Sequence, residues 1–554
     1  MLRDLPLSFR EAMDWGWAEF EPYARTLLDR QLSPSNLSEW MSDESRLLAL
    51  IHELNGRLAV AVDRNHANGA TKDRLSRFRK QVWARTRHLM NQLERKLIDS
   101  NLVPPDYDIQ LKCIRNNLEI HHPDNVDLEA EEKDLRDQYE AVRGRLRIEV
   151  GDRSYSAFDV LRMLRIEPDR ARREPLYRRI LTARTAVKEE YDAIWERLFA
   201  LRQQIARNAG VSDYRAYMWK RLNRHDYTPY DVIAFCDAIE NVIVPVVANL
   251  RRQQSAELGV DSAKPWDVTV EAQADQPLTP YRNTKEWLQR SRNVFQHISP
   301  LFGKHFDTMQ AEGLLDLESR SDKSPWNYAE WLPASNRSFV FINGRGGNSD
   351  LFMLFHEFGH AVQMIEMSAL PYLRQKMLPN EISEVASTTM ELLASDNLTE
   401  FYAPEQAELA RRNHLASMLA RWPSVAMVAL FQHWAYTNPE EGSDPEACDH
   451  YWLSLCNRFV PSVDYSGFED DLRMQWREVF QVFVFPFYYI EYAFAQLGAV
   501  QIWQNYRRNP QGTIGRFRHA LSRGYTVSIP EFYTLAGAEF GPHRETLQQA
   551  VEAI

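Results

Sequence analysis

The chain lacks the features that mark several large classes of protein. Only four cysteines occur in its 554 residues, and none of them forms a C-x-x-C pair. This excludes a disulfide scaffold and favours a reducing, cytoplasmic setting. The longest apolar run, at residues 482–490, has nine residues and is too short to span a bilayer. Charges interrupt the amino-terminal residues early, so no secretory signal is expected there.

Positive charge is also scarce in this sequence. Lysine and arginine number 66 against 77 acidic residues, which gives a net charge of −11. A general nucleic-acid binder is usually basic, so no nucleic-acid partner is expected. We expect instead a soluble protein that acts without a membrane, as a monomer or a weak homo-oligomer.

Most of the chain has the apolar spacing of α-helices, which predicts a mainly α fold. The clearest helical segments are 189–208, 230–258, 404–437 and 486–506. Residues 338–342 break this rhythm, because they are rich in aromatic and β-branched side chains and suit a strand. A glycine-rich turn follows at 343–348, and Ser349 and Asp350 can cap the next helix. The turn lacks the spacing of a phosphate-binding loop.

The next helix carries the pattern H-E-x-x-H, formed by His356, Glu357 and His360. Two histidines four residues apart share one face of a helix, so both imidazoles can reach one divalent ion. Glu357 lies beside them and can take a proton from a metal-bound water. An ordinary core helix would rarely bury three such polar groups without partners. The pattern therefore predicts a catalytic metal site.

A third protein ligand is needed, since a catalytic zinc site has three and leaves one position open. The metzincin continuation is excluded, because Gln363 and Glu366 stand where a glycine and a third histidine are required. The alternative is a carboxylate from a second helix, which the sequence predicts to start at residues 379–380.

Three carboxylates of that second helix fall near one face: Glu381, Glu384 and Glu391. One of them can bind the metal, and the others can orient a ligand imidazole. We predict Glu384 as the third ligand, 28 residues after His356. The roles of Glu381 and Glu391 stay open.

Several segments together resemble the thimet-oligopeptidase and oligoendopeptidase F family of zinc peptidases. The resemblance rests on HEFGHAVQ, on EISEVASTTMELL, and on residues 486–492, 224–229 and 532–540. It implies a two-lobed helical ellipsoid with a deep central channel and a small β-sheet beside the H-E-x-x-H helix. It also implies one zinc ion per chain, held by His356, His360 and Glu384, with Glu357 as the general base. We expect residues 1–180 to form an amino-terminal helical region and 181–554 a zincin-like catalytic region, with the metal site at 356–391.

The family's tyrosines near the scissile carbonyl match Tyr488 and Tyr492 best, and Tyr489 is the main competitor. The first two stand four residues apart on one predicted helix, where both can face one cavity. Gln481 is a departure, because relatives commonly carry histidine there. The loop after Lys323, Ser-Pro-Trp-Asn, also departs from the glycines that relatives tend to have.

The sequence thus predicts a zinc endopeptidase that acts on short peptides. Phe341, Gly344, Gln481 and Tyr489 are the candidate substrate-binding residues. If the strand at 338–342 is an edge, it can pair with the substrate backbone. A metallocarboxypeptidase, with Arg345 as its carboxylate-binding group, and a catalytically weakened peptide-binding protein are the alternatives.

Overall fold

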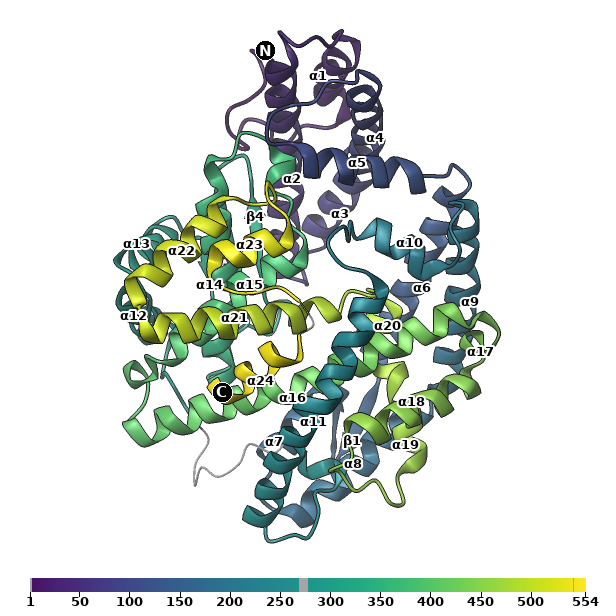
Figure 1. The fold of residues 1–554 in the computed structure, drawn as a ribbon, viewed down its shortest axis with the longest axis vertical. Coiled ribbons are helices and arrows are strands. Elements are labelled where there is room, and N and C mark those ends of the chain that lie inside the picture. The colour runs from purple at the N-terminus through teal and green to yellow at the C-terminus, as the bar shows by residue number, and fades with distance from the viewer. Residues whose placement is uncertain (1, 269–277, 542) are drawn as a thin grey trace. The chain divides into compact units, whose positions relative to one another are not determined.

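The computed structural model describes residues 2–268, 278–541 and 543–554 and confirms a mainly α-helical fold with two small sheets (Figure 1). The chain forms two compact units. The first combines Met1–Leu118, Leu278–Arg411 and Ala495–Phe540. The second combines Glu119–Pro277, Arg412–Phe494 and Gly541–Ile554. Each unit holds residues from both sides of residue 180. The sequential division at residue 180 stays a prediction.

The first unit is built of helices packed against a three-stranded sheet. Its helices are α1 (Trp17–Asp29), α2 (Leu37–Arg64), α3 (Gly69–Phe78), α4 (Ala84–Asp99), α5 (Asp108–Ile120), α12 (Thr284–Ile298), α13 (Pro300–Ala311), α14 (Asn348–Glu366), α15 (Asn380–Ser395), α22 (Pro510–Ser522) and α23 (Ile529–Ala536). Burial of Phe20, Trp40 and Leu93 joins α1, α2 and α4 into one apolar core. Such burial is the main stabilising contribution to packed helices.

The sheet of this unit has the strand order β3 (Leu315–Asp316), β5 (Arg337–Phe341), β4 (Tyr328–Leu332). β3 is parallel to β5, and β4 is antiparallel to it, with Ala329 opposite Val340. The predicted strand therefore forms, but it lies in the middle of the sheet. The expectation that it could be an edge is wrong, because both of its sides are already paired. The edge strands are β4 and the two-residue β3 instead.

Helices α14 and α15 pack closely, and Gly359 allows it. A Cβ atom at Gly359 would lie 2.6 Å from Cα of Ser387 and 2.7 Å from the carbonyl oxygen of Ala386, both in α15. Helix α15 begins where the sequence predicts, after Pro379. α14 ends at Glu366. The two helices thus present facing surfaces across a minimal gap.

The second unit is helical apart from one short hairpin, β1 (Arg147–Val150) and β2 (Arg153–Ser156), which the sequence did not predict. Its helices are α6 (Asn125–Arg145), α7 (Ala157–Ile166), α8 (Arg170–Thr185), α9 (Lys188–Asn208), α10 (Tyr214–Arg221), α11 (Pro229–Glu257), α17 (Pro439–Ser443), α18 (Pro445–Phe459), α19 (Glu469–Met474), α20 (Phe480–Phe483) and α24 (Arg544–Ala553). The predicted helices 189–208 and 230–258 correspond to α9 and α11. Thr228 and Asp231 cap α11 reciprocally.

Three helices hold residues of both units: α5, whose last two residues belong to the second unit, and the long helices α16 (Pro404–Thr437) and α21 (Ile490–Arg508). The bounds of α16 equal the predicted 404–437. By length and composition α16 could cross a membrane, but 67% of its apolar stretch is buried in the protein. A core helix passes the same test, so α16 is weak evidence for a membrane span.

Candidate metal and catalytic site

The turn before α14 is organised by Asp350. One oxygen of its carboxylate accepts hydrogen bonds from the backbone N–H groups of Arg345, Gly346 and Gly347, at 2.6, 2.7 and 3.2 Å. The hydroxyl of Tyr281 donates to the same oxygen. Asp350, one of the two predicted capping residues, therefore fixes both the glycine-rich turn and the start of α14.

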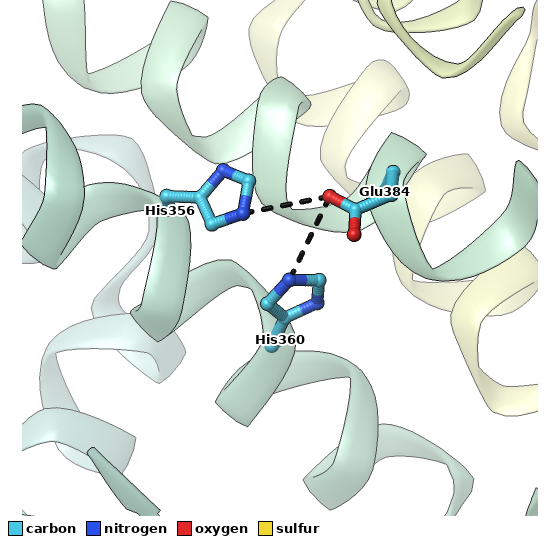
Figure 2. Close-up of side chains that lie close together, drawn as sticks. All are labelled: His356, His360 and Glu384. Carbon is cyan, nitrogen blue, oxygen red and sulfur yellow. Dashed lines mark ion pairs between the residues drawn. The ribbon is translucent and has the colours of Figure 1, made fainter. Parts of the chain in front are cut away.

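The three predicted metal ligands converge in the first unit. Nε2 of His356 lies 3.4 Å from Oε2 of Glu384, and Nε2 of His360 lies 3.8 Å from the same oxygen (Figure 2). The three potential ligand atoms all lie within 4.8 Å of one another. Two ligands bound tetrahedrally to one zinc ion, each at about 2.0–2.1 Å, stand about 3.4 Å apart. The spacing and the donor set of two imidazoles and one carboxylate therefore fit a zinc ion.

The far side of each imidazole is also bonded. Nδ1 of His356 lies 2.7 Å from Oε1 of Glu391, and Nδ1 of His360 lies 3.2 Å from the Ser383 hydroxyl. Bonds at Nδ1 leave Nε2 of both rings directed at Glu384, as metal ligation needs. Glu391 thus orients a ligand ring. Glu381 is buried, and its backbone carbonyl accepts a hydrogen bond from the hydroxyl of Tyr533 at 3.1 Å.

The surroundings shift the pKa values of the three H-E-x-x-H side chains differently. Burial raises the pKa of Glu357 to about 7, against the opposing effect of the charge on His356. Burial disfavours charge on His356, but its bond to Glu391 and the nearby carboxylates raise its pKa to about 9. Burial, and then the charge on His356, lower the pKa of His360 well below its usual value. The pKa values of the two imidazoles therefore shift in opposite directions, because Glu391 bonds His356 whereas burial dominates at His360.

Glu357 also contacts the sheet. The backbone N–H of Ala329, in the edge strand β4, lies close enough to the Glu357 carboxyl group to lower its pKa slightly. The side chain is only 5% exposed. The predicted base therefore lies beside an edge strand that the sequence analysis missed. The signal in the sequence was the run Tyr-Ala-Glu-Trp-Leu, followed by a short turn that ends at Asn336, a hairpin pattern with β5. In the structure Asn336 has a φ of +50°.

The two tyrosines predicted to be catalytic lie close together in the second unit, although they do not share one helix as predicted. The hydroxyls of Tyr488 and Tyr492 lie 3.1 Å apart. However, the helix predicted at 486–506 begins only at Ile490 as α21, so Tyr488 lies in the turn before it. The expectation that both stand on one helix is wrong. Tyr489 contacts the ring of Tyr492, and burial raises its pKa.

The remaining substrate-binding candidates are distributed between the units. Phe341 is fully buried in the central strand and stacks on Tyr328, which argues against a direct contact with a substrate. Gly344 is buried too, and a Cβ there would lie 2.6 Å from the ring of Trp287. Gln481, in the second unit, accepts a hydrogen bond at its backbone carbonyl from Gln432. Its side-chain role remains a prediction.

Comparison with known proteins places this architecture among peptidases. The family model of Peptidase family M3 matches residues 163–552. Oligopeptidase PepF of Bacillus subtilis (strain 168) is 23% identical over 254 residues, which cover 44% of this chain and 36% of that protein.

Two solved structures share the fold. The structure of PZ peptidase A with an inhibitor has a TM-score of 0.87 at 22% identity and covers 97% of this chain and 95% of that one. Oligoendopeptidase F from Enterococcus faecium has a TM-score of 0.61 at 14% identity, with coverage of 97% and 95%.

Proposed function

Because the chain belongs to peptidase family M3, as its motifs predicted, we propose that it is a zinc-dependent oligoendopeptidase that hydrolyses short peptides. The observation that carries the proposal is the convergence of His356, His360 and Glu384 within 4.8 Å. The site would hold one zinc ion per chain. We further propose that the protein acts in the cytoplasm, as a monomer or a weak homo-oligomer.

In this proposal the bound zinc supplies Lewis-acid chemistry, which acidifies water and polarises a carbonyl group. Glu357 takes the proton of the attacking water and later gives it to the leaving amine. Its burial supports this role, since a carboxyl group with a pKa of about 7 can both accept and return a proton near neutral pH. Glu391 and Ser383 fix the orientation of the two imidazole rings by bonding to Nδ1 of His356 and of His360, respectively.

We assign the substrate backbone to β4 rather than to β5. An extended peptide can add to an exposed sheet edge through main-chain hydrogen bonds, which bind it with little regard to its sequence. β4 supports this assignment because it is an edge strand and because the N–H of Ala329 within it lies beside the Glu357 carboxyl group. A peptide added to β4 would then run beside the base.

The hydroxyls of Tyr488 and Tyr492 are proposed as donors to the oxyanion that forms at the scissile carbonyl. The match of their motif to the family and the 3.1 Å contact between the two hydroxyls support this role. A phenol donor would act mainly in the transition state, so its loss should lower kcat more than it raises KM.

The test is cleavage of a short quenched peptide whose amino and carboxyl termini are both blocked. The proposal expects cleavage at an internal bond, loss of cleavage with a chelator, and recovery with zinc. Cleavage only after the carboxyl terminus is freed would favour a carboxypeptidase. Metal-bound protein without turnover would favour a peptide-binding protein.

A variant of the base separates its role from that of the ligands. Glu357→Gln should keep one zinc ion per chain and lower kcat by about 10²- to 10⁴-fold, the usual contribution of a general base. Elemental analysis beside the kinetics decides the outcome. Loss of the metal from this variant would mean that base and ligand are misassigned.

A further inference from the structure

The turn that carries Tyr488 contains an unusual backbone conformation. Among the described residues, five other than glycine have a positive φ, and four of these are asparagine or aspartate, which tolerate it. The fifth is Phe487, with a φ of +64°, and it is buried. A bulky residue in this region is strained and persists only where its surroundings determine the conformation. Phe487 directly precedes Tyr488.

Two buried polar side chains hold the backbone of Phe487. Its N–H donates to Oε1 of Gln432, in α16, at 2.9 Å, and its carbonyl accepts from Nη2 of Arg224. The Nε2 of Gln432 donates to the carbonyl of Gln481 at 3.0 Å, so one amide ties both ends of the segment 481–487. Gln432 is fully buried. Both peptide groups next to the strained residue are thus fixed from outside the turn.

Arg224 also connects the turn to the helix that follows it. The same Nη2 bonds Oε1 of Glu491, in the first turn of α21, at 2.6 Å. The two side chains are 1% and 2% exposed, so each neutralises a charge that would be costly to bury alone. The guanidinium also lies 4.5 Å from the ring centre of Trp219. Arg224 therefore fixes the orientation of the Phe487 carbonyl and the position of the first turn of α21. Tyr492 follows Glu491 directly in that turn.

From these contacts we propose that Arg224 and Gln432 are positioning residues that hold Phe487 in its left-handed conformation and thereby bring the hydroxyl of Tyr488 to that of Tyr492. Relaxation of Phe487 to an ordinary φ would redirect the chain at Tyr488, while Tyr492 stays on α21. The 3.1 Å contact between the two hydroxyls would then be lost. The inference rests on the proposed function, in which these hydroxyls stabilise the transition state.

Gln432→Met is the first test, because it removes both hydrogen bonds of the side-chain amide with little change in side-chain volume. The expected result is a loss in kcat of about tenfold to a hundredfold, the scale for a misplaced catalytic group, with KM changed less than about twofold. Gln203→Met is the matched control. Gln203 also spans two backbone groups of the second unit, accepting from the N–H of Tyr214 and donating to the carbonyl of Tyr436. Equal losses in kcat for the two variants would overturn the inference.

A double-mutant cycle distinguishes positioning from general damage. If Gln432 acts through the hydroxyls, Gln432→Met should cost nothing further in a protein that already carries Tyr488→Phe and Tyr492→Phe. Multiplicative losses would overturn the inference and leave the proposed function intact. Unchanged kcat in the tyrosine variants themselves would instead overturn the role of the tyrosines, and this inference with it.

Gln432→Glu decides the matter if the methionine variant does not fold. Its carboxylate can still accept from Phe487, but only the protonated form can donate to the carbonyl of Gln481. The kcat of this variant relative to the native protein should therefore rise as the pH is lowered. A ratio that does not change with pH would contradict the proposed tie between Gln432 and Gln481.

Discussion

At the scale of single residues, both ring nitrogens of His356 and of His360 have a partner in the candidate site. Nε2 of His356 and of His360 faces Glu384, while Nδ1 of each ring is bonded to Glu391 or to Ser383. A ring bonded on its far side loses little freedom when a metal binds. The partners at Nδ1 should therefore matter almost as much as the ligands.

We expect Glu391→Gln to lower zinc affinity by about tenfold to a hundredfold, because the charge that orients and polarises His356 is lost. Competition with a chelator of known affinity measures the effect. Glu366→Gln is the control, since Glu366 is in the same helix as His356 but its carboxylate is bonded to Arg518. Native zinc affinity in Glu391→Gln would show that the bond at Nδ1 is dispensable.

The raised pKa of Glu330, in β4, should make the free energy of unfolding depend on pH. Burial raises its pKa to about 7, from 4.5 in the unfolded chain, and a Cβ at Gly56 would lie 2.1 Å from its Oε1. Between these two pKa values the folded state holds a proton that the unfolded state has released, so stability falls as the pH rises. The loss should be about 1–3 kcal/mol in total.

Glu330→Gln removes this titration. Its melting temperature relative to the native protein should therefore rise between pH 5 and pH 8, as thermal denaturation at several pH values would measure. A difference that is constant over this range would contradict the raised pKa.

At the scale of elements, the metal site depends on the distance between α14 and α15. Two ligands come from α14 and one from α15, and Gly359 lets the helices approach closely. The sequence predicts both helices from their periodicity and their starts. It does not predict β4 as an edge or the start of α21 at Ile490, because strand order and turn geometry depend on residues far away in the chain.

Gly359→Ala should separate the two helices. The added methyl group would meet backbone atoms of α15, so we expect a loss of about 1–3 kcal/mol in stability and weaker zinc binding. Gly515→Ala, in α22, is the matched control, because a Cβ there meets nothing within 4 Å. The control should be neutral or more stable by up to about 1 kcal/mol. Thermal melting and zinc titration of both variants test the prediction, and equal behaviour would contradict it.

At the scale of the whole molecule, the predicted site residues divide between two compact units. The metal ligands, the base and the edge strand belong to the first unit, and the tyrosines with their supporting network belong to the second. Neither unit is one continuous stretch of chain. The channel implied by the family resemblance therefore stays a prediction, as does the sequential division at residue 180.

Removal of zinc should lower the melting temperature of the protein. A ligand that binds only the folded state at about 1,000 times its dissociation constant adds about 4 kcal/mol of stability. We expect chelation to lower the melting temperature by several degrees. A variant carrying His356→Ala and His360→Ala should show no response to the chelator. An unchanged melting temperature in native protein that has lost its zinc would contradict this prediction.

The sequence by itself determined the mainly helical fold, the family and the candidate metal ligands, because these depend on short-range spacing: two histidines four residues apart, and a helix start before Glu384. Only the tertiary structure decided which strand is the edge, which side chains support the imidazoles, and how Tyr488 reaches Tyr492. Those features depend on contacts between distant segments, such as Glu391 with His356 and Arg224 with Phe487. The local spacing of residues in the sequence does not predict such contacts, because long-range packing overrides the local conformational preference of a segment wherever the two differ.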